Sequence, residues 1–122
     1  MKRYNTFFEP RSKYLHAIVR GFDLDPKIEL SYLSDVISEC RKQKYARILI
    51  EKDIPKKLTN DEVIEVACKF ASMDVADLKI AFVDQPQDGL SQSPFISLVA
   101  RNRGINAEAF DGVGKAEHWL LS

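Results

Sequence analysis

Residues 78–102 read LKIAFVDQPQDGLSQSPFISLVARN, and this stretch decides the fold because an apolar run, a polar loop and an amphipathic segment follow one another. Residues 80–83 are four consecutive apolar residues, a pattern typical of a strand that is covered on both faces of its sheet. Ser93 and Pro94 predict a helix start, because serine can cap a helix and the φ of proline is already helical. A strand, a loop and a helix start in this order predict the edge at which open α/β sheets most often bind ligands.

Two strands and a helix are predicted at the beginning of the chain. Residues 3–8 and 14–22 have strand character and are separated by residues 9–12, a turn sequence that contains Pro10, so we expect an antiparallel pair. Asp25 and Pro26 then predict the start of a helix that runs to about residue 44. Its buried face should carry Leu30, Leu33, Val36, Ile37 and Cys40, and its solvated face Lys27, Glu29, Asp35, Glu39 and Arg41.

The middle of the chain predicts a short strand and a second helix. Residues 47–50 (RILI) form the strand, and the charged, proline-containing residues 51–58 form a loop. Thr59 and Glu62 have the spacing of a capping box, which starts a helix at this point. The apolar stripe of that helix is wide and should face a sheet; it carries Val63, Val66, Ala67 and Phe70, with Ile64, Cys68 and Ala71 beside it.

The last third of the chain completes the alternation of helices and strands. The helix from Pro94 should pack Phe95, Leu98 and Val99 inward and end at Gly104, since glycine tolerates a left-handed backbone. Residues 105–110 form the last strand, and a terminal helix over residues 113–121 is anchored by Ala116, Trp119 and Leu120. The order β-β-α-β-α-β-α-β-α predicts a single α/β domain over residues 1–122, with helices packed on a mixed, mostly parallel sheet of about five strands.

Composition limits the classes of partner and the compartment. The 18 basic and 18 acidic residues cancel, so no overall positive field favours nucleic acid. Cys40 and Cys68 lie at apolar helix positions and are interpreted as reduced core residues. The beginning of the chain lacks the apolar core of a signal peptide, and no apolar run approaches the roughly 20 residues that span a bilayer. We therefore expect a soluble, cytoplasmic protein with no membrane span.

Residues 106–120 close the chain with the run NAEAFDGVGKAEHWL, a strand followed by a helix. This run and the element order resemble the sulfate-transporter and anti-sigma-factor-antagonist fold, abbreviated STAS. In small bacterial SpoIIAA-like proteins of this fold, a last strand ending in Phe and Asp is followed by a helix that carries Ala and a Trp-Leu pair. The matching residues of this chain are Phe110, Asp111, Ala116, Trp119 and Leu120. The resemblance implies a STAS-like domain that works by regulation and protein interaction.

The resemblance also implies a possible phosphorylation site. The anti-sigma-factor antagonists exchange partners when a serine in an Asp-Ser-Ser-Gly-type motif is phosphorylated, and this motif is absent from residues 53–62. Thr59 is the hydroxyl residue at the corresponding helix end. A phosphate on Thr59 would be stabilised by the helix N-terminus and repelled by Asp61 and Glu62. The alternative is that Thr59 simply caps its helix.

Four aspartates, Asp23, Asp53, Asp84 and Asp111, each follow a predicted strand and so could lie along the carboxyl edge of the sheet. Asp53 and Asp84 are the candidate ligands of a Mg²⁺ ion, which would indicate a small metal-dependent hydrolase. The alternative is that aspartate is simply preferred in turns, with no metal involved. No catalytic residue is predicted, because neither histidine has metal-ligand spacing and no nucleophile motif is present.

The sequence therefore predicts a non-enzymatic regulatory, ligand-sensing or protein-interaction domain of the STAS-like type, without a cofactor. A metal-dependent hydrolase and a phospho-regulated partner-switching protein are the alternatives. The expected partner is a protein or a small apolar or anionic ligand, and a homodimer is possible. The candidate recognition loop after the apolar strand contributes Asp84, Gln85, Gln87, Ser91 and Ser93.

Overall fold

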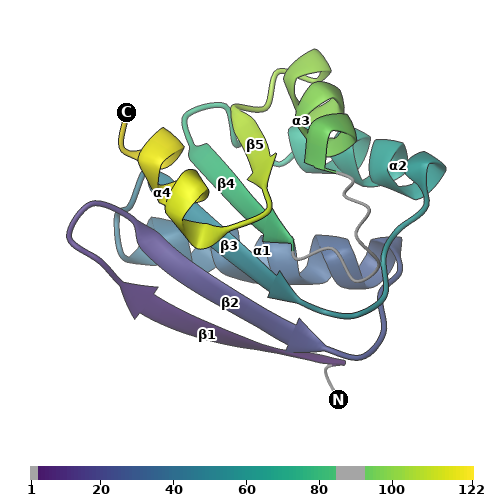
Figure 1. Cartoon of the computed structure of the whole chain (residues 1–122), viewed down its shortest axis with the longest axis horizontal. Coiled ribbons are helices and arrows are strands. Elements are labelled where there is room, and N and C mark those ends of the chain that lie inside the picture. Colours follow the sequence, from purple (N-terminus) through teal and green to yellow (C-terminus); the bar gives the residue numbers. More distant parts are fainter. Residues whose placement is uncertain (1–2, 85–92) are drawn as a thin grey trace.

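The computed structural model describes residues 3–84 and 93–122, which form five strands and four helices in the predicted order (Figure 1). All five strands lie in one sheet, and each strand is hydrogen-bonded to the strand before it in the chain. The first pair is antiparallel and the later pairs are parallel, which confirms the predicted mixed sheet. The strands are β1 (Tyr4–Pro10), β2 (Leu15–Gly21), β3 (Arg47–Asp53), β4 (Lys79–Asp84) and β5 (Ala107–Phe110).

Helices cover both faces of this sheet. A large core that includes Leu15, Ile50 and Ile80 lies between one sheet face and three helices: α1 (Pro26–Lys42), α2 (Asn60–Ala71) and α3 (Ser93–Asn102). A smaller core lies on the opposite face beneath α4 (Val113–Leu120), which packs across β3, β4 and β5 (Figure 1). No helix of the described residues is long and apolar enough to cross a membrane.

The apolar run of residues 80–83 forms the interior of β4, which lies between β3 and β5. Side chains alternate between the two faces of a strand. Ile80 accordingly belongs to the large core, whereas Ala81 and Val83 belong to the core beneath α4, and all three are buried. The predicted burial on both faces is confirmed, because helices from two different parts of the chain cover the two sides of this strand.

The helix α1 confirms its predicted start and corrects its predicted polar face. Asp25 caps the helix, since its Oδ1 accepts a hydrogen bond of 2.8 Å from the backbone N–H of Ile28. The predicted apolar residues Leu33 and Val36 are buried. Glu29, however, does not lie on the solvated face; it is buried, because it precedes Leu33 by four residues and so belongs to the same helical stripe.

Two strands are longer than predicted. β3 continues through residues 51–53, which were expected to form a loop, and β1 includes Glu9 and Pro10 of the expected turn. The reason is pairing across the sheet: Lys52 lies between Val19 of β2 and Asp84 of β4, and hydrogen bonding to strands on both sides holds charged residues in the extended conformation. Pro10 is tolerated because it ends an edge strand.

The structure corrects two further predictions, for Cys68 and Leu98, and confirms a third, for Gly104. Cys68 is exposed and not a core residue, because the stripe from Val63 to Phe70 already faces the sheet; Arg103 donates a hydrogen bond of 3.1 Å to its sulfur. Leu98 does not point inward as predicted; it is 52% exposed, since it lies two residues from buried Ala100 and therefore on the other side of α3. Gly104 follows α3 with φ of +76°, which confirms the predicted left-handed end.

Candidate functional site

An apolar pocket lies between the sheet and the three helices that cover its larger core. The stripe of α2 lines one wall, because the spacing of its apolar residues turns all of them toward the sheet. The opposite wall comes from Phe82 of β4, two alanines of β5 and Ile96 of α3. The small side chains of Ala107 and Ala109 leave room beneath α2 and α3, and the resulting cavity has a volume of about 70 Å³.

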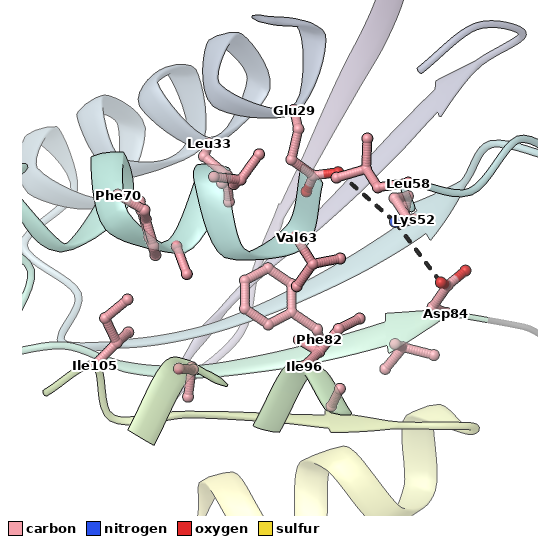
Figure 2. A pocket seen from close by; sticks show the side chains of 16 residues that line it. Glu29, Leu33, Lys52, Leu58, Val63, Phe70, Phe82, Asp84, Ile96 and Ile105 are labelled. Atoms are coloured by element: carbon pink, nitrogen blue, oxygen red, sulfur yellow. Dashed lines mark ion pairs between the residues drawn. The ribbon is translucent and has the colours of Figure 1, made fainter. Parts of the chain in front are cut away.

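One end of this pocket is ionic. Glu29 from the first turn of α1, Lys52 of β3 and Asp84 at the end of β4 meet there, opposite Phe70 and Ile105 at the other end (Figure 2). Lys52 Nζ lies 3.7 Å from Glu29 Oε1 and 3.7 Å from Asp84 Oδ2. The side chain of Glu29 is 8% exposed, and those of Lys52 and Asp84 are each 12% exposed. We call these three residues the buried ionic cluster.

The two oxygens of Glu29 have different surroundings. Oε2 accepts a hydrogen bond from the hydroxyl of Tyr32, one turn further along α1. Burial, and then the negative charge of Glu29, raise the pKa of Tyr32 well above its ordinary value, so this tyrosine stays neutral and donates its proton. Oε1 is buried and has no hydrogen-bond partner among the described residues. Within the part of the chain that the structure describes, the ionic end of the pocket therefore contains one unsatisfied acceptor, Glu29 Oε1.

The sequence patterns predicted only one member of the buried ionic cluster, Asp84, as part of a recognition loop. Its companions Gln85, Gln87 and Ser91, together with the side chain of Ser93, lie outside the described residues. The spacing of Glu29 from Leu33 and Val36 is a signal that could have placed Glu29 on the buried stripe. Lys52 had no such local signal, since only the strand register brings it next to Asp84.

The strand-end aspartates do not form a common group. Lys52 and Asp53 are neighbours in β3 and so point to opposite faces of the sheet, which separates Asp53 from Asp84. Each carboxylate has its own cations: Asp53 pairs with Arg20, whereas Asp23 and Asp111 pair with other basic side chains. In residues 3–84 and 93–122, no three His, Cys, Asp or Glu side chains are grouped so that they could hold a metal. This geometry gives no support to a metal site shared by Asp53 and Asp84.

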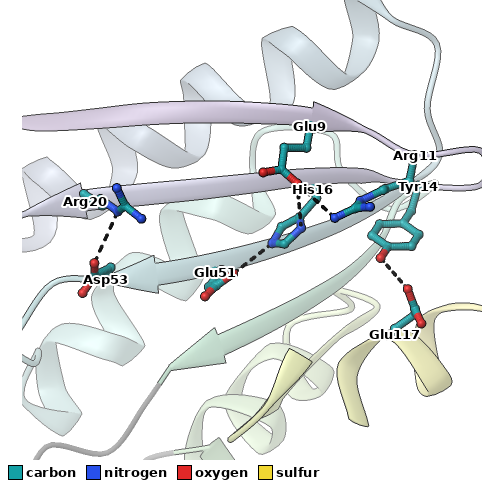
Figure 3. Close-up of polar contacts among 8 residues, drawn as sticks. All are labelled: Glu9, Arg11, Tyr14, His16, Arg20, Glu51, Asp53 and Glu117. Carbon is teal, nitrogen blue, oxygen red and sulfur yellow. Dashed lines mark hydrogen bonds and ion pairs between the residues drawn. The ribbon is translucent and has the colours of Figure 1, made fainter. Parts of the chain in front are cut away.

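A second buried polar group lies on the same sheet face as α4, because His16 alternates along β2 with Leu15 and Ala17 of the large core. His16 of β2 is 6% exposed, and its Nε2 lies 3.0 Å from Glu51 Oε1 (Figure 3). Its Nδ1 lies 3.9 Å from Glu9 Oε2 and has no hydrogen-bond partner among the described residues. The sequence patterns did not predict this grouping, because Glu9 and Glu51 were assigned to a turn and a loop.

Nearby, Tyr14 joins β2 to the terminal helix. Its hydroxyl donates a hydrogen bond of 2.6 Å to Glu117 Oε2 of α4 (Figure 3). Burial, and then this hydrogen bond, raise the pKa of Tyr14 to about 12. Tyr14 is therefore a neutral donor at physiological pH and helps to hold α4 on the sheet.

Thr59 has the predicted capping role. Its hydroxyl accepts a hydrogen bond of 3.2 Å from the backbone N–H of Glu62, and Glu62 Oε1 accepts one of 2.9 Å from the backbone N–H of Thr59. The capping box is thus complete. Whether Thr59 is also phosphorylated stays a prediction, which mass spectrometry of the peptide from a native cell extract would test.

Thr59→Ala should lower the free energy of unfolding by about 1 kcal/mol, because an N-terminal N–H of α2 loses its partner. Thr59→Ser is the matched control and should stay close to the wild type, since serine also caps. Urea unfolding followed by circular dichroism measures both variants. Equal loss in the alanine and serine variants would contradict the capping role.

No protein-family model matches the chain, and none of the curated proteins matches it either. The class of protein that the structure itself defines is a single-sheet α/β protein with a mixed five-stranded sheet and an apolar pocket that is ionic at one end.

Proposed function

We propose that this chain is a non-enzymatic regulatory domain of the STAS-like type that senses a small apolar ligand. The order of its elements supports this proposal, as does the terminal run, in which Phe110 of β5 contacts Trp119 of α4 with their ring centroids 5.7 Å apart. The observation that carries the ligand-sensing part is the pocket, because its walls are apolar and its few polar groups gather at one end. Such a site can hold an apolar body and orient it by one polar contact.

The position of the pocket suits a sensor. The pocket is lined by α1, β3, α2 and β4, which precede residue 85, and by α3 and β5, which follow residue 92. An occupant would therefore contact both parts of the chain. A ligand that binds the folded chain alone also stabilises it in proportion to its concentration and affinity. Binding of a ligand in the pocket would therefore change the stability of the large core. Such a change is a physical basis for regulation without catalysis.

Ala67→Leu should fill the pocket and lower the affinity for an apolar probe at least about tenfold, because the added carbons occupy the space that the probe needs. Ala67 lines the pocket on α2. Isobutanol is a suitable neutral probe, because its hydrocarbon body is no larger than a leucine side chain. Its binding is measured from the methyl NMR shifts of Val63, Val66 and Ile96, which also line the pocket.

Ala76→Leu is the matched control, since Ala76 is exposed and is not part of the pocket lining. It should bind isobutanol as the wild type does. Equal affinity in both leucine variants, or no shift of the pocket methyl groups in the wild type, would contradict the proposed function. The methyl spectrum of each variant also shows directly that its core is folded.

A further inference from the structure

The buried ionic cluster is not electrically balanced. It contains the carboxylates of Glu29 and Asp84 and only the one ammonium group of Lys52, and all three side chains are at least 88% removed from solvent. Among the described residues that line the pocket, Lys52 is the one cation, so two carboxylates and one ammonium group leave a single negative charge at this end. An uncompensated charge away from water is unfavourable, so a further positive charge would be stabilised there.

Among the described residues, no hydrogen-bond donor reaches Glu29 Oε1. Glu29 Oε2 is occupied by Tyr32, whereas Glu29 Oε1 has no hydrogen-bond partner among the described residues. Lys52 Nζ does not supply the bond, since 3.7 Å is longer than a hydrogen bond between nitrogen and oxygen. A ligand that carries N–H groups would satisfy this oxygen, and a buried unsatisfied acceptor makes such a contact favourable.

The need for a positive charge and the need for a hydrogen-bond donor distinguish between classes of ligand. A carboxylate or phosphate would add negative charge where one is already in excess, and Lys52 is already shared by two carboxylates. A neutral alcohol could donate to Glu29 Oε1 but would leave the charge unbalanced. An ammonium group would donate a hydrogen bond to Glu29 Oε1 and would also balance the charge. Two cations would then face two anions at one end of the pocket (Figure 2).

The rest of the pocket determines the body of the ligand. Its walls beyond the cluster are apolar side chains such as Val63, Phe70, Ile96 and Ile105. A cavity of about 70 Å³ admits a small hydrocarbon group rather than a large one. We propose that the pocket binds small hydrophobic amines in their ammonium form, with the ammonium group on Glu29 and Asp84 and the hydrocarbon body between α2 and the sheet. This inference rests on the proposed function of the pocket as a ligand site.

Three probes with the same isobutyl body test the inference on the full chain at pH 7: isobutylamine, isobutanol and 3-methylbutanoate. Alkyl amines are protonated at this pH, as lysine is. We expect isobutylamine to bind about tenfold or more tightly than isobutanol, which corresponds to one well-placed charged contact. The carboxylate 3-methylbutanoate should bind more weakly than isobutanol. Methyl NMR titration measures all three affinities at constant ionic strength.

Glu29→Gln should reduce the preference for the amine to within about twofold of the alcohol, because it removes the negative charge in excess. Glu65→Gln is the matched control, since Glu65 is an exposed residue of α2 that pairs with Lys69 outside the pocket. It should keep the full preference. Asp84→Asn is a second variant that removes the same charge from the other carboxylate, and it replaces Glu29→Gln if that variant does not fold.

The outcomes separate the two proposals. If isobutanol binds in the pocket and isobutylamine binds no more tightly, the inference about amines is wrong and the ligand-sensing function stands. A preference for the amine that persists in both Glu29→Gln and Asp84→Asn would also overturn the inference, because the cluster would then not be its cause. If none of the three probes shifts the pocket methyl groups, the proposed function is wrong and the inference is wrong with it.

Discussion

Lys52→Met should lower the free energy of unfolding by about 3–5 kcal/mol, because it leaves the carboxylates of Glu29 and Asp84 buried without a cation. Methionine occupies nearly the same space as the lysine stem, so the loss reports charge rather than packing. The Lys52 side chain is 12% exposed and lies 3.7 Å from both carboxylates. Urea unfolding followed by circular dichroism measures the change.

Lys69→Met is the matched control for this prediction. Lys69 also pairs with a glutamate, at 3.3 Å, but its side chain is 61% exposed. Its loss should change the free energy of unfolding by less than about 1 kcal/mol, since water screens an exposed ion pair. A Lys52→Met variant as stable as Lys69→Met would contradict the burial of the cluster. Adding Glu29→Gln and Asp84→Asn to Lys52→Met should restore much of the stability, because no unpaired charge then remains.

Phe70→Ala should lower the free energy of unfolding by about 3–5 kcal/mol, because it removes an aromatic ring from the large core and leaves a cavity. Phe70 is 3% exposed and lies on the stripe of α2 that faces the sheet. The existing pocket borders this residue, so the space left by the ring would join a cavity that is already present. The surrounding side chains can therefore relax little into it.

Phe22→Ala provides the same chemical change at an exposed position, since Phe22 is 93% exposed. We expect it to change the free energy of unfolding by no more than about 0.5 kcal/mol. Chemical denaturation of both variants gives the comparison directly. Similar losses in the two variants would mean that α2 does not pack on the sheet as the structure describes.

Local patterns predicted much of the fold correctly. The apolar run of β4, the proline that starts α1 and the capping box of α2 each depend on residues that are close in sequence. Their physical causes are also local: alternation along a strand, a preset φ angle and hydrogen bonds within one helical turn. The alternation of elements that follows from them then predicted the mixed sheet.

The incorrect predictions share a different cause, namely contacts between segments that are distant in the sequence. Residues 51–53 have the composition of a loop, and only hydrogen bonding to β2 and β4 makes them a strand. Leu98 is apolar and was expected to be buried, but α3 packs through the neighbouring Ser97 and Ala100. Ser97 is buried because its hydroxyl accepts a hydrogen bond of 2.9 Å from the backbone N–H of Ala109. Contacts between distant segments decided each of these positions.

The sequence by itself determined the order of helices and strands and the class of fold, because periodicity and capping act over a few residues. Only the tertiary structure decided the candidate site. Glu29, Lys52 and Asp84 come from a helix and two strands. The parallel register places Lys52 beside Asp84, and Glu29 of α1 lies within 3.7 Å of Lys52. These charges are removed from water by the way in which the separate elements pack together, and no local sequence pattern encodes that packing.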